Sequence, residues 1–246
     1  MGTDSIPVTW SPAPASPTLH ADEVHLWRAS LNCDLPVLSR LEATLSPDET
    51  ARANRFVLLK DRSHFVAARG ILRELLGAYL RSSPANLQFS YGNHGKPALE
   101  SKTSSSSLQF NLSHCGGLAV YAFSFGRRLG IDVEQIRPQL AGEDIARRYF
   151  ATRELAELRT LPPRLQSEGF FLCWTRKEAY VKAQGGGLSI PLDSFTVSLT
   201  PGQPEDLQTE DSAQWSLHSL DPCPGYVAAV VGEGKDWRLR RWVWRG

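Results

Sequence analysis

The sequence predicts an α+β protein built from two structurally similar halves that meet near residue 126. Three observations lead to this fold class. The chain has 246 residues, which is enough for one large domain or for two small ones. It is 41% hydrophobic and 22% charged, a composition typical of a folded globular protein. The order of the predicted elements, a strand followed by helices and then by strands, occurs twice along the chain.

The chain begins with a tail, and the first half then opens with a strand. Residues 1–22 contain four prolines and no periodic apolar pattern, so we expect an extended or mobile tail. Residues 24–31 (VHLWRASL) form a predicted strand. Residues 46–49 (SPDE) combine an N-cap hydroxyl, a proline at the first helical position and a capping-box glutamate, which predicts a helix start. Helical spacing then covers residues 49–60 and 63–81.

The middle of the chain is predicted to form strands, and the second half repeats the order of the first. Residues 87–91 are strand-like, residues 92–95 form a predicted turn, and residues 101–107 a polar loop. Antiparallel strands are expected at 108–113, 118–125 and 129–136. Helices follow at about 143–150, 152–160 and 166–184, then a glycine-rich stop and four β-type segments. We therefore divide the chain into a tail (1–22), a first half (23–125) and a second half (126–246).

Net charge, cysteine spacing and the distribution of apolar residues argue against several classes of function. The chain has 27 Lys and Arg against 26 Asp and Glu, and this net charge of +1 gives no general attraction to nucleic acid or to acidic membranes. Its four cysteines lie far apart, which argues against a zinc site or a disulfide framework. No apolar stretch reaches the length of about 18 residues that a membrane span needs, and no signal peptide is visible. We expect a cytoplasmic protein with neither nucleic acid nor a membrane as partner.

Three motifs carry candidate chemistry, and the first is Gly130-Ile131-Asp132-Val133-Glu134. On a strand Ile131 and Val133 would face the core, while Asp132 and Glu134 emerge on one side about 6–7 Å apart. Two carboxylates placed in this way repel each other unless a hard cation such as Mg²⁺ lies between them. The alternative is an exposed strand face with two solvated acids.

The second motif, residues 174–182 (WTRKEAYVK), lies in a predicted helix. At 100° per residue, Trp174, Lys177, Glu178 and Lys182 fall within an arc of about 140°. Only six of the 27 basic residues are lysines, so two of them on this face suit a role that needs compact charges. The alternative is a surface helix with a Glu178–Lys182 ion pair and Trp174 anchored in the core.

The third motif is Phe110-Asn111-Leu112-Ser113-His114, at the end of a predicted strand. Together with Lys96 and the arginines of the first helices, its hydroxyl and imidazole are donors suited to phosphate oxygens. Taken alone, His114 would be interpreted as a structural histidine.

In this order, the three motifs resemble those of the Sfp-type 4'-phosphopantetheinyl transferases: F-N-x-S-H, G-[I/V]-D-x-E and W-x-x-K-E-[A/S]-x-x-K. The resemblance extends from the S-P-D-E-x-x-R-x-x-R-F helix start through GKPAL to GLSIPLDSFTVSL and PGYVAAVV, or roughly residues 24 to 232. It implies a fold of two similar α/β halves related by pseudo-twofold symmetry, with the active site in the cleft between them.

The resemblance also implies the activity. Members of this family take the phosphopantetheine arm of coenzyme A and attach it to a serine hydroxyl of an apo acyl or peptidyl carrier protein, releasing 3',5'-ADP. By similarity, Asp132, Glu134 and Glu178 would hold Mg²⁺. Glu178 would be the general base, directly or through a metal-bound water, with a water held by Asp132 or Glu134 as the alternative. Lys182 would neutralise the transferred phosphate.

The remaining site residues are expected to bind coenzyme A or the carrier. Similarity points to the following coenzyme A ligands: Arg52, Lys96, Ser113 and His114, with Lys177 on the leaving-group side and Arg55 and Arg69 as weaker candidates. For the carrier, we expect a basic or apolar surface in the helices around 143–165, including Arg147, Arg148 and Phe150. A chain with two fused halves favours a monomer. The sequence leaves open whether the carrier serves fatty acid, polyketide or nonribosomal peptide synthesis.

Two other functions compete with this interpretation. A metal-dependent phosphoesterase or nuclease would use the same three acids, but a nuclease needs a more basic surface than a net charge of +1 provides. A non-catalytic coenzyme A-binding module would have no need for the costly cluster of Asp132, Glu134, Glu178 and Lys182.

Overall fold

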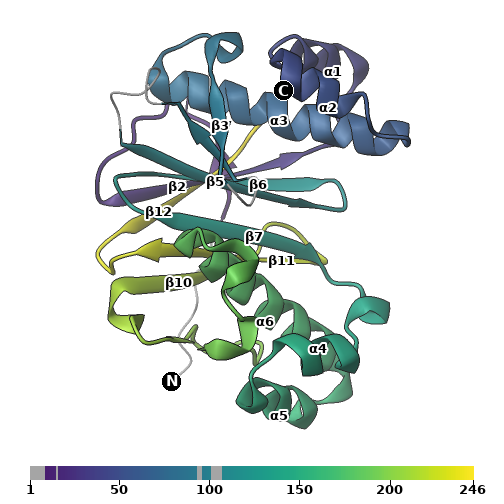
Figure 1. Ribbon diagram of the computed structural model, residues 1–246, viewed down its shortest axis with the longest axis vertical. Coiled ribbons are helices and arrows are strands. Elements are labelled where there is room, and N and C mark those ends of the chain that lie inside the picture. The colour runs from purple at the N-terminus through teal and green to yellow at the C-terminus, as the bar shows by residue number, and fades with distance from the viewer. Residues whose placement is uncertain (1–8, 15, 93–95, 101–106) are drawn as a thin grey trace.

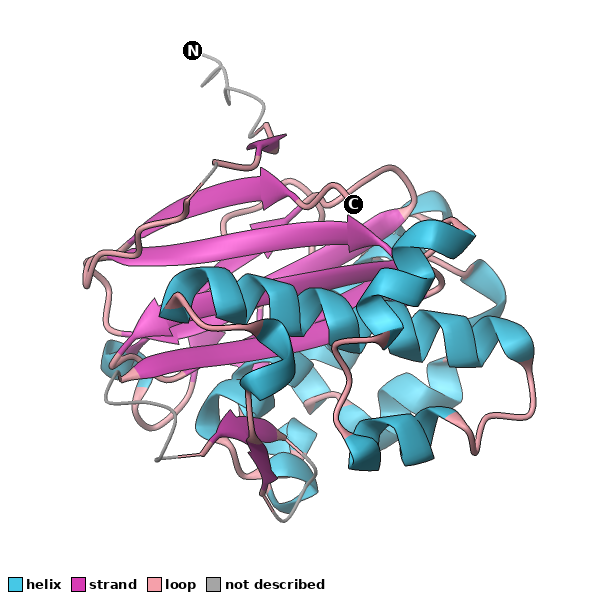
Figure 2. Cartoon of the chain, turned by 90° about the horizontal axis from the view of Figure 1, so that it is seen from above, coloured by secondary structure: helices cyan, strands magenta, loops and turns pink. Residues whose placement is uncertain are grey.

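The protein forms four layers: helices, a sheet, a second sheet and helices again (Figure 1). The computed structural model describes residues 9–14, 16–92, 96–100 and 107–246. The larger sheet has the strand order β1-β12-β2-β6-β5, and the smaller sheet has the order β10-β11-β7. Seen from above, the strands of the larger sheet run across the molecule beneath helices of the first half (Figure 2). These layers agree with the predicted α+β class.

The first half has a strand order that the second half repeats. β2 (Glu23–Ser30) pairs antiparallel with β6 (Leu118–Phe125), and β6 pairs antiparallel with β5 (Leu108–Cys115). The 22-residue helix α3 (Leu59–Leu80) covers this sheet together with α1 (Leu35–Glu42) and α2 (Pro47–Ala53). The predicted capping box is present, because the Ser46 N–H donates to Glu49 Oε2 at 3.1 Å. The sequence did not predict α1, and α2 ends at Ala53 rather than continuing to residue 60.

The second half contains the same arrangement. β7 (Leu129–Gln135) pairs antiparallel with β11 (Tyr226–Glu233), which pairs antiparallel with β10 (Trp215–Leu220). The long helix α6 (Pro163–Gln184), again of 22 residues, packs on this sheet. α4 (Glu143–Tyr149) and α5 (Thr152–Thr160) lie outside α6. The order β2-β6-β5 of the first half therefore has its counterpart in the order β7-β11-β10 of the second half, with every pair antiparallel. This repeated order confirms the predicted fold of two similar halves.

The two chain ends depart from this simple division. β12 (Arg238–Val243) belongs to the second half by sequence, but it pairs in parallel with β2 of the first half. β1 (Ser11–Pro12), from the predicted tail, pairs in parallel with β12. The Trp10 indole N–H donates to the carbonyl of Asp221 at 2.9 Å, so this part of the tail is held against the body of the protein. Pairing with β12 satisfies the edge of β2, which would otherwise present unpaired backbone groups.

Apolar side chains from both sheets form a shared core. Leu26 and Val120 from the larger sheet and Ile131 and Val230 from the smaller sheet are fully buried in one cluster. Val133 belongs to the same cluster, so the predicted inward direction of the alternate residues of β7 is confirmed. This core fixes β7 against β5 and β6, and so fixes the position of its acidic residues.

Short elements complete the fold. They are the pairs β3 (Phe89–Tyr91) with β4 (Pro97–Leu99) and β8 (Thr196–Val197) with β9 (Leu207–Gln208), and 3-10 helices at 84–86, 138–140, 187–189, 192–194 and 212–214. Most of the predicted turn at 92–95 and of the polar loop at 101–107 lies outside the described residues. Within the described residues, no helix combines the length and the hydropathy that a membrane span requires.

Candidate active site

The candidate site lies where β5, β7 and α6 meet. The side-chain oxygen of Asn111 on β5 accepts the Ile131 N–H of β7 at 2.9 Å and ties the two strands together. Gly130 lets α6 lie directly on β7, because a Cβ atom there would be 2.2 Å from the Ala179 carbonyl oxygen and 2.3 Å from the Ala183 nitrogen. This close approach brings the last turns of α6 beside the acidic residues of β7.

Asp132 is the centre of the site. The residue is 4% exposed, and its Oδ1 atom accepts from Ser113 Oγ at 2.8 Å and from Lys182 Nζ at 2.5 Å. Lys182 Nζ also donates to Ser113 Oγ at 3.2 Å, which closes a triangle of three side chains from three elements. The other oxygen, Oδ2, is buried and has no hydrogen-bond partner among the described residues. One residue from each predicted motif therefore meets at a single carboxylate.

Two further carboxylates respond to the charge of Asp132. Burial raises the pKa of Glu178, and the negative charges of Asp132 and Glu134 raise it further, while Lys182 lowers it. Burial also raises the pKa of Glu134, and the charge of Asp132 adds to this effect. All three acids are therefore close enough to destabilise one another as anions.

These three carboxylates have the chemistry of a magnesium site, although their side chains are not assembled into one. Among the described residues, no group of three His, Cys, Asp or Glu side chains converges as a metal site. Within the part of the chain that the structure describes, the buried Asp132 Oδ2 has no partner, and the mutual repulsion of the three acids favours a cation between them. Lys182 supplies the positive charge next to Asp132 in this structure. The donor set fits Mg²⁺ in kind and in charge.

Lys96, a residue of the first half, contacts the main chain of β7 and α6 beside the site. Its ammonium group donates to the carbonyl oxygens of Lys182 at 2.8 Å and of Leu129 at 3.3 Å. Burial, together with the positive charge of Lys182, lowers the pKa of Lys96 to about 8. Its predicted place beside the site agrees with the structure, but its partners are main-chain atoms of α6 and β7.

Positive charge also surrounds His114. Its side chain is exposed, yet desolvation lowers its pKa, and the charges of Lys182, His64, Arg69 and Arg52 lower it further. His64 extends from α3 and contacts the Asn32 side chain at 3.0 Å. An anionic ligand near His114 would meet several cations at once.

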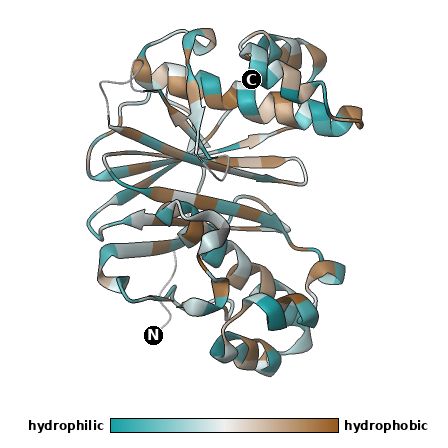
Figure 3. Ribbon diagram, viewed as in Figure 1, coloured by the Kyte–Doolittle hydropathy of each residue, from teal (hydrophilic) through white to brown (hydrophobic). Residues whose placement is uncertain are grey.

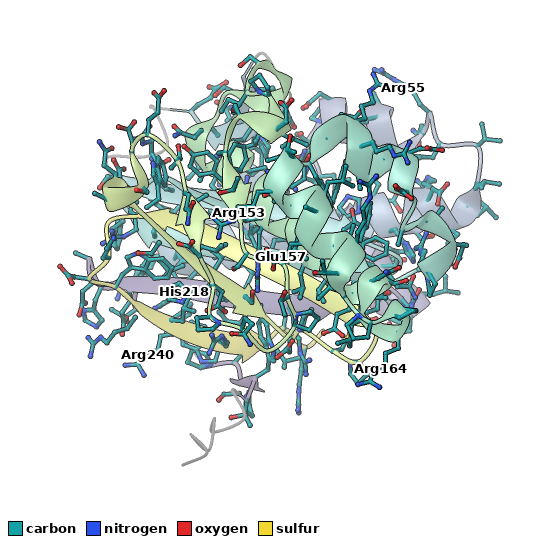
Figure 4. All side chains as sticks on the ribbon, turned by 90° about the horizontal axis from the view of Figure 1, so that it is seen from below. Arg55, Arg153, Glu157, Arg164, His218 and Arg240 are labelled. Carbon is teal, nitrogen blue, oxygen red and sulfur yellow. The ribbon has the colours of Figure 1, made fainter. Side chains whose placement is uncertain are left out.

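The three arginines predicted for coenzyme A have different environments. Arg69 is 7% exposed, pairs with Glu49 at 3.2 Å and lies 5.6 Å from the ring centres of Phe89 and Tyr91. Its Nη1 atom is buried, and no described residue provides it with a hydrogen-bond partner. Arg52 is exposed and packs over the Phe65 ring. Arg55 is exposed at the outer edge of the molecule (Figure 4), so the structure does not bring it to the cluster around His114.

The structure corrects the prediction for Lys177. This lysine is fully buried and points away from Glu178, toward the core of the second half. Its ammonium group pairs with Glu154 Oε2 at 2.8 Å and donates to the carbonyls of Leu192 at 2.6 Å and Phe195 at 2.7 Å. Trp174 also packs into that core. The predicted helix face is therefore divided between the cleft and the core, because α6 is covered on more than one side.

The predicted carrier surface is also corrected in part. Phe150 is 4% exposed and belongs to the core of the second half, so it is not available to a partner. Arg147 and Arg148 are exposed on α4, and Arg147 pairs with Glu143 at 2.8 Å.

A cavity of about 440 Å³ opens beside the acidic cluster. Its walls are mostly apolar, and its polar end reaches the site; the lining includes Leu112, Val181, Ile190, Leu192, Glu178 and Lys182. An apolar space that ends at charged groups suits a ligand with a flexible arm and a phosphate head.

Three structurally important residues, two in the site and one in the core beneath it, were not singled out from the sequence. They are Asn111, which ties β5 to β7; Gly130, which admits α6; and Glu154, which holds Lys177. The first two lie inside the quoted motifs, so the motif spacing was an available signal. Glu154 gave no local signal, because its partner lies 23 residues away on another helix.

Comparison with known proteins supplies the family. Residues 128–231 match the family model described as the 4'-phosphopantetheinyl transferase superfamily, and residues 30–125 match the model described as 4'-phosphopantetheinyl transferase, N-terminal. The chain is 45% identical over 234 residues to 4'-phosphopantetheinyl transferase HetI of Nostoc sp., covering 95% of this chain and 98% of that protein. It is 28% identical over 198 residues to 4'-phosphopantetheinyl transferase Sfp of Bacillus subtilis, covering 80% of this chain and 86% of that protein.

A solved structure also matches part of the chain. It is a holo-(acyl-carrier-protein) synthase from Bacillus anthracis in complex with CoA (3',5'-ADP), 21% identical, with a TM-score of 0.36 over 44% of this chain and 96% of that one. The two family models and the match to HetI along nearly the whole chain establish that this protein belongs to the 4'-phosphopantetheinyl transferase superfamily.

Proposed function

We propose that this protein transfers the 4'-phosphopantetheine arm of coenzyme A to a serine hydroxyl of an apo carrier protein and releases 3',5'-ADP. The observation that carries the proposal is the meeting of Ser113, Asp132 and Lys182 in one hydrogen-bonded triangle beside Glu134 and Glu178. Phosphoryl transfer needs positioning and charge neutralisation more than covalent chemistry, and this cluster offers charges of both signs.

Asp132, Glu134 and Glu178 would hold Mg²⁺. The unpartnered Asp132 Oδ2 and the charge coupling of the three acids support this assignment. When bound, the metal neutralises diphosphate oxygens and so favours departure of the nucleotide.

The reaction forms one bond and breaks one. The serine oxygen attacks the phosphorus next to the pantetheine arm, and the bond from that phosphorus to the oxygen of 3',5'-ADP breaks. Glu178 accepts the serine proton in our proposal, and its raised pKa makes it a stronger base than an ordinary carboxylate. A water held by Asp132 or Glu134 is the other candidate. Lys182 would neutralise the transferred phosphate, and its ammonium group lies 2.5 Å from Asp132 Oδ1 at the centre of the site.

Coenzyme A would lie across the junction of the halves. Lys96, Ser113 and His114 would face its phosphates, with the positive field of Arg52 and Arg69 behind them. The cavity of about 440 Å³ would receive the pantetheine arm, since its apolar walls end at Glu178 and Lys182.

The test is a transfer assay read by intact mass. Purified protein is mixed with coenzyme A, Mg²⁺ and a panel of apo carrier proteins. We expect a phosphopantetheine-sized mass gain on a carrier that depends on Mg²⁺ and falls by about a hundredfold or more in Glu178→Gln. Glu168→Gln, on the same helix, is the matched control and should retain the gain.

The outcomes separate the competing functions. No gain on any carrier, with thermal stabilisation by coenzyme A still present, would favour the non-catalytic coenzyme A-binding module. Stabilisation by DNA rather than by coenzyme A would favour a nuclease. The relative rates across carriers would identify the biosynthetic class that the enzyme serves.

We also propose that the enzyme works as a monomer in the cytoplasm. Two halves in one chain already supply the interface at which the site is built. The four free cysteines are compatible with a reducing compartment.

A further inference from the structure

An exposed apolar surface lies outside the described site. Val57, Leu58 and Leu59 are 94%, 63% and 81% exposed, and the neighbouring Phe56 is 38% exposed. Phe56, Val57 and Leu58 lie between α2 and α3, and Leu59 is the first residue of α3; we call residues 54–60 the α2–α3 corner. Figure 3 shows hydrophobic ribbon at this outer corner of the first half. A contiguous group of exposed apolar side chains often marks a surface that binds another molecule.

Side-chain contacts lead from the corner to Arg52, one of the positive charges near His114. The Phe56 and Phe65 rings lie 5.4 Å apart, and the Arg52 guanidinium lies 5.3 Å from the Phe65 ring centre. Arg52 is also one of the cations that lower the pKa of His114. The contacts Phe56–Phe65 and Phe65–Arg52 thus join the apolar corner to a cation whose charge acts on His114.

The corner is also positively charged. Arg55 and Lys60 are exposed within it, and Asp61 is the exposed acid beside Lys60. Arg62 is paired with Glu42 and adds little net charge. The surface is therefore apolar with a net basic border.

We propose that the α2–α3 corner is a docking surface for the carrier protein, with Val57, Leu58 and Leu59 contacting apolar residues beside the carrier's serine and Arg55 and Lys60 facing its acidic side chains. This inference rests on the proposed transfer to a carrier. An acidic protein whose serine lies next to an apolar patch complements such a surface in both charge and hydrophobicity. It also gives Arg55 a partner other than coenzyme A.

The surface predicted from the sequence is the natural competitor. It lies on α4 in the other half, where Phe150 is buried and Arg147 is engaged with Glu143. Leu140, 49% exposed just before α4, is an apolar residue of comparable size on that side. It provides a matched control.

The experiment compares steady-state kinetics of Val57→Ser/Leu58→Ser/Leu59→Ser with those of Leu140→Ser, using an apo carrier that the wild-type protein modifies. We expect the triple variant to raise KM for the carrier by about tenfold or more, with kcat and KM for coenzyme A unchanged. Leu140→Ser should leave all three constants unchanged. Because all three substituted residues are exposed, the variant should fold, which circular dichroism and Tm would verify.

A charge variant gives a second, independent readout. Lys60→Glu should raise KM for the carrier most strongly at low salt, because screening weakens an exposed charge contact. An effect independent of salt would contradict the charged part of the proposal.

The remaining outcomes are decisive as well. An unchanged carrier KM in the triple variant, or an equal rise in Leu140→Ser, overturns the docking assignment while transfer by the wild type preserves the proposed function. Co-sedimentation with phosphatidylglycerol vesicles that is lost in the triple variant, with carrier KM unchanged, assigns the corner to a lipid surface. A dimer that becomes a monomer in the triple variant, again with KM unchanged, assigns it to a second copy of the chain. A wild type that modifies no carrier refutes both proposals.

Discussion

Lys177 and Lys182 lie five residues apart on α6 and have opposite environments. Lys177 is fully buried and satisfied by one carboxylate and two carbonyls. Lys182 reaches from the helix to Asp132 and Ser113 at the cleft. A buried ammonium with three oxygen partners stabilises the fold, whereas a partly exposed one beside an acid is free to serve a substrate.

Substitution of these two lysines should separate stability from turnover. Lys177→Met leaves Glu154 charged and buried, so we expect the free energy of unfolding to fall by about 3–5 kcal/mol. Lys182→Ala also removes the cation from a buried carboxylate, Asp132, so it should lower this free energy as well, but it should in addition lower kcat more than the affinity for coenzyme A. Urea unfolding and steady-state kinetics on both variants check this. A raised KM with unchanged kcat in Lys182→Ala would contradict its proposed role.

Lys96 should give the protein a characteristic alkaline pH dependence. Its pKa falls from an ordinary 10.5 to about 8 on folding, so between these values the unfolded chain binds a proton that the folded one has lost. Stability from this group therefore rises with pH across that window, by up to about 3 kcal/mol and by less where solvent reaches it. The measurement is the unfolding free energy of the wild type minus that of Lys96→Met, between pH 7.5 and 10.5. A flat difference would refute the lowered pKa.

At the scale of elements, the site depends on how closely α6 approaches β7. The two are in contact along the strand, and at Gly130 the backbone of α6 comes too close to leave room for a side chain. The hydrogen bond from the Ile131 N–H to the Asn111 side chain then fixes the position of β5 relative to β7. The residues of the candidate site thus lie on a helix and two strands that the core holds in place, rather than on loops.

Gly130→Ala should therefore damage the site through the backbone. Its methyl group would meet main-chain atoms of Ala179 and Ala183, which cannot rotate away, so α6 must shift. We expect a loss of stability of about 1–3 kcal/mol and a fall in kcat, because Lys182 and Glu178 move with the helix. Gly142→Ala is the control, since nothing lies within 4 Å of the added atom. Equal stability and activity of the two variants would show that the contact is not important.

At the scale of the whole molecule, the ends of the chain stabilise the first sheet. Trp242 on β12 packs against Trp27 with ring centres 5.1 Å apart and against His25 at 4.5 Å. Leu239 packs against the core shared by the two sheets. The fold is therefore not two independent halves in sequence, because the last strand returns to the first half.

Deletion of residues 236–246 should destabilise the first sheet in particular. It removes the partner strand of β2 and the contacts of Leu239 and Trp242, each worth about 1.5–3 kcal/mol when buried. We expect a lower Tm and poor solubility, because β2 becomes an edge. Hydrogen exchange should show the loss of protection in β2 before β7. Unchanged protection in β2 would contradict this role of β12.

Much of the fold and site could be predicted from local patterns. Period-2 alternation correctly placed Ile131 and Val133 in the core, and the capping signals at Ser46 and Glu49 correctly located a helix start. The direction of Lys177 could not be predicted, because α6 is buried on more than one side and a helical wheel gives only relative angles. The parallel pairing of β12 with β2 joins residues more than 200 positions apart, and no local pattern encodes it.

The return of β12 to β2 has a consequence for synthesis on the ribosome. The larger sheet cannot close until β12 has left the exit tunnel, so more than 200 further residues must be translated after β2 before β2 is covered on both sides. Until β12 emerges, the nascent first half exposes a bare strand edge. A ribosome that stalls before β12 would yield a chain with every motif residue present and yet no completed scaffold to hold them.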